Sequence, residues 1–211
     1  MDLTAPFRGV KVSLKSQLEH WVEVLEEWCL VHERYCRMAP GDAIFWNGER
    51  ANVGALAAAA WRAGSVALEE YTLPKQYKQA NYHGRADLWL GSTETNDYIE
   101  AKFQWLIAPT TERGIAQVAA TLDTACQEAA SNQVSEPHAC RVGLVFCAVY
   151  VKKRERRQMD EHVRGCIEAT VRIPHGASAW CFPTPVRALS GGRGDDYLYP
   201  GIILLARVST R

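Results

Sequence analysis

Three charged residues lie inside two segments that otherwise resemble β-strands. Asp87 belongs to the mainly apolar run 86–91, and Glu100 and Lys102 belong to the run 97–104. Burying a charge costs free energy unless the charge is paired or holds a metal. The three residues therefore either converge on a site or form the polar face of an ordinary surface hairpin.

Strand geometry favours a shared site. Side chains alternate across a strand, so Glu100 and Lys102 point to the same face, about 6–7 Å apart. Asp87 can approach that face if the two segments pair as a hairpin. Two carboxylates suit Mg²⁺, and a neighbouring lysine adds positive charge beside a phosphate oxygen or an attacking water. The set contains the groups that metal-assisted phosphodiester hydrolysis requires.

The pattern Glu-x-Lys is short and arises by chance in many chains. Here Glu100-Ala101-Lys102 is the single instance, and Gly84-Arg85-Ala86-Asp87 precedes it in another strand-like segment. The competing interpretation is a salt-bridged hairpin with one polar and one apolar face, which antiparallel sheets often show.

Together, Gly84-Arg85-Ala86-Asp87 and Glu100-Ala101-Lys102 resemble the D…E-x-K signature of the PD-(D/E)XK, restriction-endonuclease-like nuclease superfamily. The αβββαβ core of that superfamily is similar to the order expected for residues 46–151, about half of the chain. Ala86 stands where many members have proline.

The resemblance implies a role for each matching position. Asp87 and Glu100 would bind Mg²⁺, for which Mn²⁺ can substitute, and the backbone carbonyl of Ala101 would join them. Lys102 would help to position the attacking water. Many members also carry an acid on the helix before the first core strand. Glu49 is the candidate here and Glu70 its rival, although helix dipoles favour acids in first turns in any case.

Four further residues near these motifs could contact nucleic acid: Lys75, Lys78, Arg85 and Gln104. Lys75, Lys78 and Arg85 stand among Tyr77 and Tyr82, a combination that suits backbone contacts and base stacking but also fits an ordinary long hairpin loop. Gln104 could touch a phosphate or order the water, or be an ordinary polar strand end. The basic run 152–157 is either a phosphate contact or a solvated helix start.

Periodicity predicts an α/β or α+β fold with a central mixed sheet flanked by helices. Helices are expected at 13–38, 47–63, 110–130 and 154–170, strands at 65–73, 86–91, 97–104, 141–151, 177–182 and 201–208, and a connection at 74–83. The division predicted is a single domain, 1–211, with an N-terminal helical extension (1–45), the nuclease-like core (46–151) and a C-terminal helix and strands (152–211).

Bulk composition sets wider bounds. The chain has 211 residues, 24 basic and 24 acidic, so strong non-specific DNA binding gains no support from net charge. Seven irregularly spaced cysteines favour reduced thiols over a zinc site. The N-terminus does not resemble a signal peptide and no apolar run could span a membrane, so a cytoplasmic protein is expected.

Three function classes remain open at this stage. The first is a Mg²⁺-dependent DNA nuclease, which by analogy with the superfamily would act in defence against foreign DNA or in mobile-element biology, as a homodimer or within a larger complex. The second is a non-cleaving subunit with a nuclease fold that binds nucleic acid or a partner. The third is a hydrolase of RNA or of another phosphoester, because the motif addresses the phosphate and not the sugar.

Overall fold

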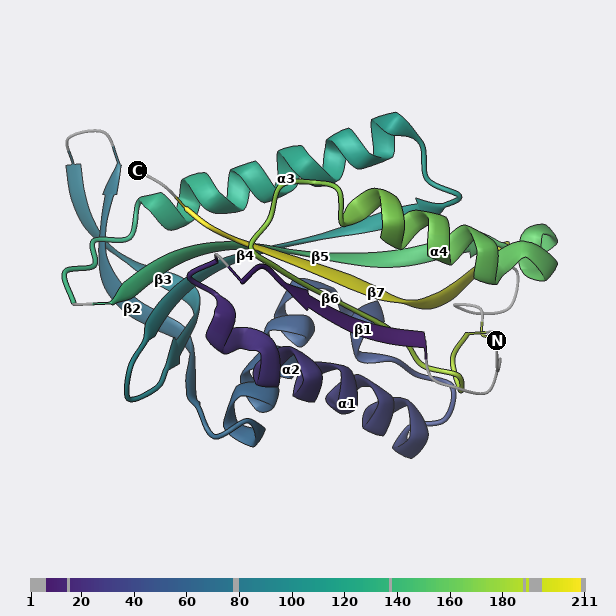
Figure 1. Cartoon of the computed structure of the whole chain (residues 1–211), viewed down its shortest axis with the longest axis horizontal. Helices are drawn as coiled ribbons and strands as arrows, with labels where there is room; N and C mark the ends of the chain where they lie inside the picture. The colour runs from purple at the N-terminus through teal and green to yellow at the C-terminus, as the bar shows by residue number, and fades with distance from the viewer. Residues whose placement is uncertain are drawn as a thin grey trace.

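The computed structural model describes residues 7–14, 16–77, 80–136, 138–187, 189 and 195–209. These residues form an α+β structure in which one mixed sheet lies between two layers of helices (Figure 1). Helices α1 and α2 cover one face of the sheet, and α3 and α4 cover the other.

The strands are β1 (Phe7–Val12), β2 (Val66–Tyr77), β3 (Ala80–Gly91), β4 (Asn96–Ala108), β5 (Ala139–Lys152), β6 (Ala177–Phe182) and β7 (Tyr197–Val208). The helices are α1 (Val22–Met38), α2 (Gly48–Arg62), α3 (Glu112–Ala130) and α4 (Met159–Thr170), with short 3-10 turns η1 (Glu19–Trp21), η2 (Ile44–Asn47) and η3 (Lys153–Gln158).

The seven described strands lie in the order β1-β6-β7-β5-β4-β3-β2. Strands β4 and β5 are parallel, and every other neighbouring pair is antiparallel. A parallel pair needs a crossover, and α3 supplies it between β4 and β5. Strands from all three expected parts of the chain join this one sheet.

The elements around the charged residues agree well with the sequence analysis. Helix α2 ends before Gly64, which has the positive φ of 84° that a C-terminal stop requires. Helix α3 begins after Thr111, whose side chain accepts a hydrogen bond from the Gly114 N–H. The expected strand 177–182 is confirmed as β6, and the seven cysteines are free thiols, as expected.

The N-terminal region differs from the expectation of one helix over 13–38. A strand, β1, precedes it and pairs with β6, and the α-helix begins only at Val22. Leu14 fits the helical periodicity but is 86% exposed, so it takes no part in the core. The region is therefore a strand followed by a helix, and not a purely helical extension.

The expected connection over 74–83 is wrong, because β2 extends to Tyr77 and β3 begins at Ala80, so the described residues of this range belong to one long hairpin. Glu70 has a positive φ of 55° and interrupts the alternation of β2. Before it, Ala67 packs on the core under α1 and α2. After it, Tyr71 and Leu73 pack with Tyr98 in a separate cluster.

The distal half of this hairpin consequently bends toward the α3 side of the sheet (Figure 1). The Gln76 N–H donates to the Ser131 carbonyl, and the Gln133 N–H donates to the Pro74 carbonyl. These bonds tie the hairpin to the end of α3 and bring the inner face of β2 over β4.

We expect Gly143→Ala to destabilise the fold, because α3 lies directly on β5 at that position. A Cβ on Gly143 would come within 2.4 Å of the Cys126 backbone nitrogen. Such overpacking costs about 1–3 kcal/mol. Urea unfolding should show a lower midpoint, whereas Gly165→Ala, in an open position of α4, should raise stability by about 0.5–1 kcal/mol. An unchanged midpoint for Gly143→Ala would contradict the close packing of α3 on β5.

Candidate functional site

The candidate site lies where β3 and β4 separate. Their described ladder runs from the Gly91–Asn96 pair to the Leu88–Ile99 pair. Strand β4 continues beyond this point, paired on its other side with β5 as far as Ala108. The edge of β4 that faces β3 is therefore released from strand pairing after Ile99.

Carboxylates accept hydrogen bonds from backbone N–H groups along this unpaired edge of β4. Asp87 Oδ2 accepts a hydrogen bond of 2.7 Å from the Ala101 N–H. Glu49, in the first turn of α2, accepts a hydrogen bond from the backbone of Phe103, which follows Ala101 by two residues on β4. The N–H and C=O of one strand residue point to the same edge, so the Ala101 carbonyl also faces the gap. Asp87, Glu49 and this carbonyl thus lie along one strand edge.

Glu100 is buried beside them and is held by two donors. Lys75 Nζ lies 2.6 Å from Glu100 Oε1, and Asn132 Nδ2 lies 3.1 Å from the same oxygen. Both donors use Oε1, so Oε2 is the oxygen that can face a ligand. The aliphatic stem of Lys75 passes over Gly84, where a Cβ would come within 2.7 Å of Lys75 Cδ. The glycine of the first motif therefore makes room for this lysine.

Lys102 and Gln104 contact α3. Lys102 Nζ lies 2.6 Å from Glu128 Oε2, and the Thr121 hydroxyl donates to the Gln104 amide oxygen at 2.6 Å. Glu100, Lys102 and Gln104 therefore share the α3 face of β4, as strand alternation predicts.

Burial and repulsion between carboxylates change the pKa values of the charged residues of the site. Burial raises the pKa of Asp87, of Glu49 and of Glu100. The charge of Asp87 raises the pKa of Glu49 and of Glu100 further, while Lys75 opposes the rise at Glu100. Burial alone would lower the pKa of Lys102, but the ion pair with Glu128 and the charges of Glu49 and Asp87 outweigh it and raise that pKa.

The charge balance suits a divalent cation. Four carboxylates, those of Glu49, Asp87, Glu100 and Glu128, interact with two ammonium groups. No three His, Cys, Asp or Glu side chains of the described residues converge at ligand spacing. Mg²⁺ usually takes one or two carboxylates and several waters, so Asp87, Glu100 and the Ala101 carbonyl are a sufficient donor set.

The structure brings most of the sequence-predicted residues together. Of the two rival third acids, Glu49 interacts with Asp87 and Lys102, whereas Glu70 is exposed and lies 3.3 Å from Arg85. That ion pair leaves Arg85 on the outer surface of the hairpin.

Two of the predicted nucleic-acid contacts, Lys75 and Lys78, differ from the others in what the structure shows of them. Lys75 was expected to contact DNA, but it is 8% exposed and paired with Glu100, so it belongs to the interior of the site. Beyond Glu70 the inward residues of β2 pack in the cluster around Tyr98 on the α3 side, which is where Lys75 meets Glu100. Lys78 lies outside the described residues.

Sequence reasoning missed the roles of Glu128 and Asn132. Both come from α3 or its end and reach side chains of β4. Neither belongs to a motif, and they stand 26 and 32 residues from their partners. Only the packing of α3 across β4 and β5 reveals them.

We expect Mg²⁺ to stabilise the protein at pH 8 and not at pH 4. Raised carboxylate pKa values mean that the stability contributed by protonation is present below about pH 4 and is lost as pH rises through the folded-state values. A cation replaces the lost protons at high pH. At tenfold excess over its Kd it should contribute about 1.4 kcal/mol, a Tm rise of about 3–5 °C.

The matched variant is Asp87→Asn, which keeps an acceptor for the Ala101 N–H. It should raise the Tm of the metal-free protein at pH 8 and abolish the Mg²⁺ shift. Glu94→Gln, at an exposed acid in the β3–β4 turn, should behave as the wild type. An undiminished Mg²⁺ shift in Asp87→Asn would exclude this site as the cause.

We expect Lys75→Met to destabilise the protein strongly at pH 8, because it leaves Glu100 buried without its cation. Loss of one partner of a buried pair costs about 3–5 kcal/mol. The loss should shrink as the pH is lowered, because the raised pKa of Glu100 favours uptake of a proton, and Glu100→Gln in the same chain should recover much of it. Arg85→Met, which breaks an exposed pair, should cost less than about 1 kcal/mol. Equal losses of stability in Lys75→Met and Arg85→Met would contradict the existence of a buried Lys75–Glu100 ion pair.

No helix in the described part of the chain is both long and apolar enough to cross a membrane.

A scan against protein-family models gave no match, and neither did searches of curated proteins and of solved structures. The chemistry of the site is therefore the basis for assigning a function.

Proposed function

We propose that this chain is a metal-dependent nuclease that hydrolyses DNA phosphodiester bonds, with a core of the PD-(D/E)XK type formed by α2, β2, β3, β4, α3 and β5. The chain order of these elements and the parallel β4–β5 pair support this core. The observation that carries the proposal is that Asp87 interacts with the charges of both Glu100 and Lys102 where β3 leaves β4.

Asp87, Glu100 and the Ala101 carbonyl would hold the cation, with Glu49 beside them. When bound, the divalent cation would supply a Lewis acid and lower the pKa of a water molecule. The Lys75 and Asn132 donors hold Glu100 in one position, so its free oxygen is oriented before substrate arrives. Such preorganisation lowers the cost of reaching the transition state.

Lys102 is the more exposed of the two ammonium groups of the site. Its raised pKa keeps the ammonium charged at neutral pH. An incoming phosphate would compete with Glu128 for this ammonium, because Lys102 is partly exposed and its partner carboxylate lies near the surface. Lys102 would then stabilise the negative charge that develops on the phosphate oxygens and on the attacking water.

The ion pairs of both lysines favour one alternative. Lys75 and Lys102 each already have a carboxylate partner, and a site closed in this way would suit a non-cleaving subunit that binds DNA or a partner protein. The two functions differ in whether cutting occurs. DNA as substrate, a second subunit and a cytoplasmic location remain part of the proposal.

Cleavage of plasmid and single-stranded DNA in Mg²⁺, Mn²⁺ or EDTA tests the proposal. Lys102→Ala should lower the metal-dependent rate at least about 10²-fold, as removal of one transition-state-stabilising group does. Asp87→Asn should do the same, whereas Lys11→Ala, on the distant edge strand β1, should cut normally. Cutting that persists in EDTA or in Lys102→Ala would refute this mechanism. Absence of cutting by a folded wild type that still binds DNA would favour the subunit.

A further inference from the structure

Four aromatic side chains line a pocket of about 320 Å³ at one end of the sheet: Trp105 from β4, Tyr150 from β5, and Tyr197 and Tyr199 from β7. We refer to these four residues as the aromatic platform. Their ring centroids lie 5.3 Å apart for Trp105–Tyr199, 5.2 Å for Tyr150–Tyr197 and 6.4 Å for Trp105–Tyr150. The rings meet nearly edge to face, so several aromatic surfaces border one pocket.

The platform is supported from within and open to solvent. The Phe103 ring packs against Trp105 at 5.4 Å, yet Trp105 remains 44% exposed. The exposed part of this indole is apolar surface that a ligand could remove from water. Clustered aromatic side chains that keep exposed faces typically mark a binding surface.

The platform adjoins the candidate site along two segments. Trp105 follows Lys102 by three residues on β4, about 10 Å along the strand. Strand alternation places it on the opposite face from Lys102, the face from which Glu49 approaches. Trp46 lies 6.2 Å from the Tyr199 ring and precedes Glu49 by three residues. A substrate that follows the free edge of β4 from the site would therefore reach the platform.

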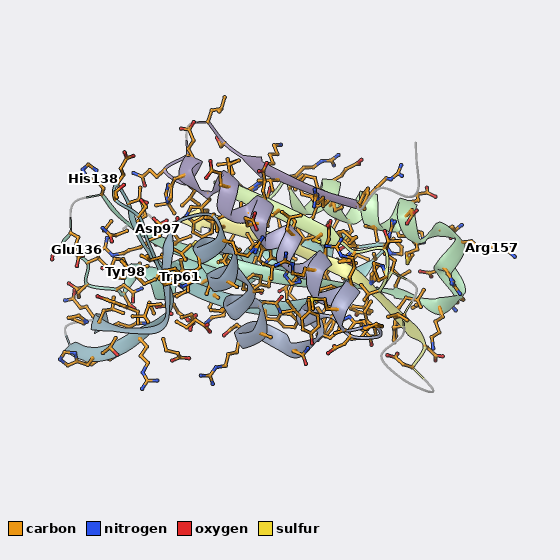
Figure 2. The ribbon with its side chains drawn as sticks, turned by 90° about the horizontal axis from the view of Figure 1, so that it is seen from below. Trp61, Asp97, Tyr98, Glu136, His138 and Arg157 are labelled. Atoms are coloured by element: carbon orange, nitrogen blue, oxygen red, sulfur yellow. The ribbon has the colours of Figure 1, made fainter. Side chains whose placement is uncertain are left out.

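Basic residues border the platform on its outer side. Lys152 pairs with Tyr197 in the sheet, and the Lys153 N–H donates to the Asp196 carbonyl. The segment 152–157 carries five basic residues and one acidic residue. Its last member, Arg157, lies at the end of the molecule opposite Asp97 and Tyr98, which mark the start of β4 (Figure 2).

This charge distinguishes between the two ligands that aromatic pockets usually take. Asp195 lies against the Tyr199 hydroxyl and would by itself attract a quaternary ammonium. The five basic residues of segment 152–157 outnumber the three nearby acids Glu155, Asp195 and Asp196, so the surroundings as a whole favour an anionic ligand. A nucleic acid would be attracted through its phosphates while a base stacks on the rings, because every base has a π-face.

We propose that the aromatic platform binds an unpaired base of a single-stranded nucleic-acid segment, with the adjoining phosphates against segment 152–157. The proposal rests on the proposed function only for the class of substrate. It adds that the substrate is single-stranded, or is opened, on the side of the site nearest Glu49.

The test is binding without cutting. Lys102→Ala protein in EDTA is titrated against a fluorescein-labelled oligothymidylate of about 12 nucleotides, and the anisotropy is recorded. Trp105→Leu in that background should weaken binding about tenfold or more, and Trp105→Phe should retain most of it. Trp61→Leu is the matched control, because Trp61 is 59% exposed and lies in the half of the molecule away from Arg157 (Figure 2).

A second variant, Tyr197→Leu, keeps the test decisive if Trp105→Leu does not fold. It should weaken binding in the same direction. Affinities equal to that of Trp61→Leu in both platform variants would overturn the proposal. Displacement of the oligonucleotide by millimolar trimethyl-lysine, with saturable binding of that amine, would also overturn it and assign the pocket to a cation.

The outcomes separate this proposal from the proposed function. Platform-dependent binding by a wild type that cuts no DNA would support the platform and refute the nuclease. Metal-dependent cutting by a protein whose Trp105→Leu and Tyr197→Leu variants bind single strands normally would support the nuclease and refute the platform.

Discussion

The separation of β3 from β4 after the Leu88–Ile99 pair is the constraint on which the candidate site depends. A strand edge inside a protein cannot leave its N–H groups without partners. Here carboxylates from β3 and α2 take the place of a neighbouring strand. The need to pair these N–H groups therefore brings negative charge to one place. The Ala101 carbonyl faces the same gap between β3 and β4.

That gathering of charge is itself costly, and the surrounding structure offsets it only in part. Lys75 and Asn132 neutralise and orient Glu100, and Lys102 is balanced by Glu128. The pKa of each inner carboxylate still remains raised. Burial is the main cause of these raised pKa values, and repulsion between the carboxylates adds to it at Glu49 and Glu100. Under the proposed function, a divalent cation would offset both costs when it binds.

Strand β4 connects the two surfaces to which we assign functions. Its residues toward α3 supply Glu100 and Lys102, and its opposite face supplies Trp105. Glu49 and Trp46 belong to one short segment that reaches both surfaces. A single strand inside the sheet, paired with β5 along its length, therefore sets the distance between the charged site and the aromatic platform, independently of the loops.

The sequence by itself determined the α+β class, most elements from α2 to β6, and the shared face of Glu100 and Lys102. Each of these follows from local periodicity, turn residues or strand alternation. It could not reveal strand β1, whose signal is short, or the full length of the β2–β3 hairpin. Only the tertiary structure decided that Lys75 turns inward, that α3 supplies Glu128 and Asn132, and that Glu49 and not Glu70 approaches Asp87. The reason is physical: at Glu70, which has a positive φ, β2 passes from the core under α1 and α2 to the cluster around Tyr98, and the crossover of α3 joins residues that no sequence spacing relates.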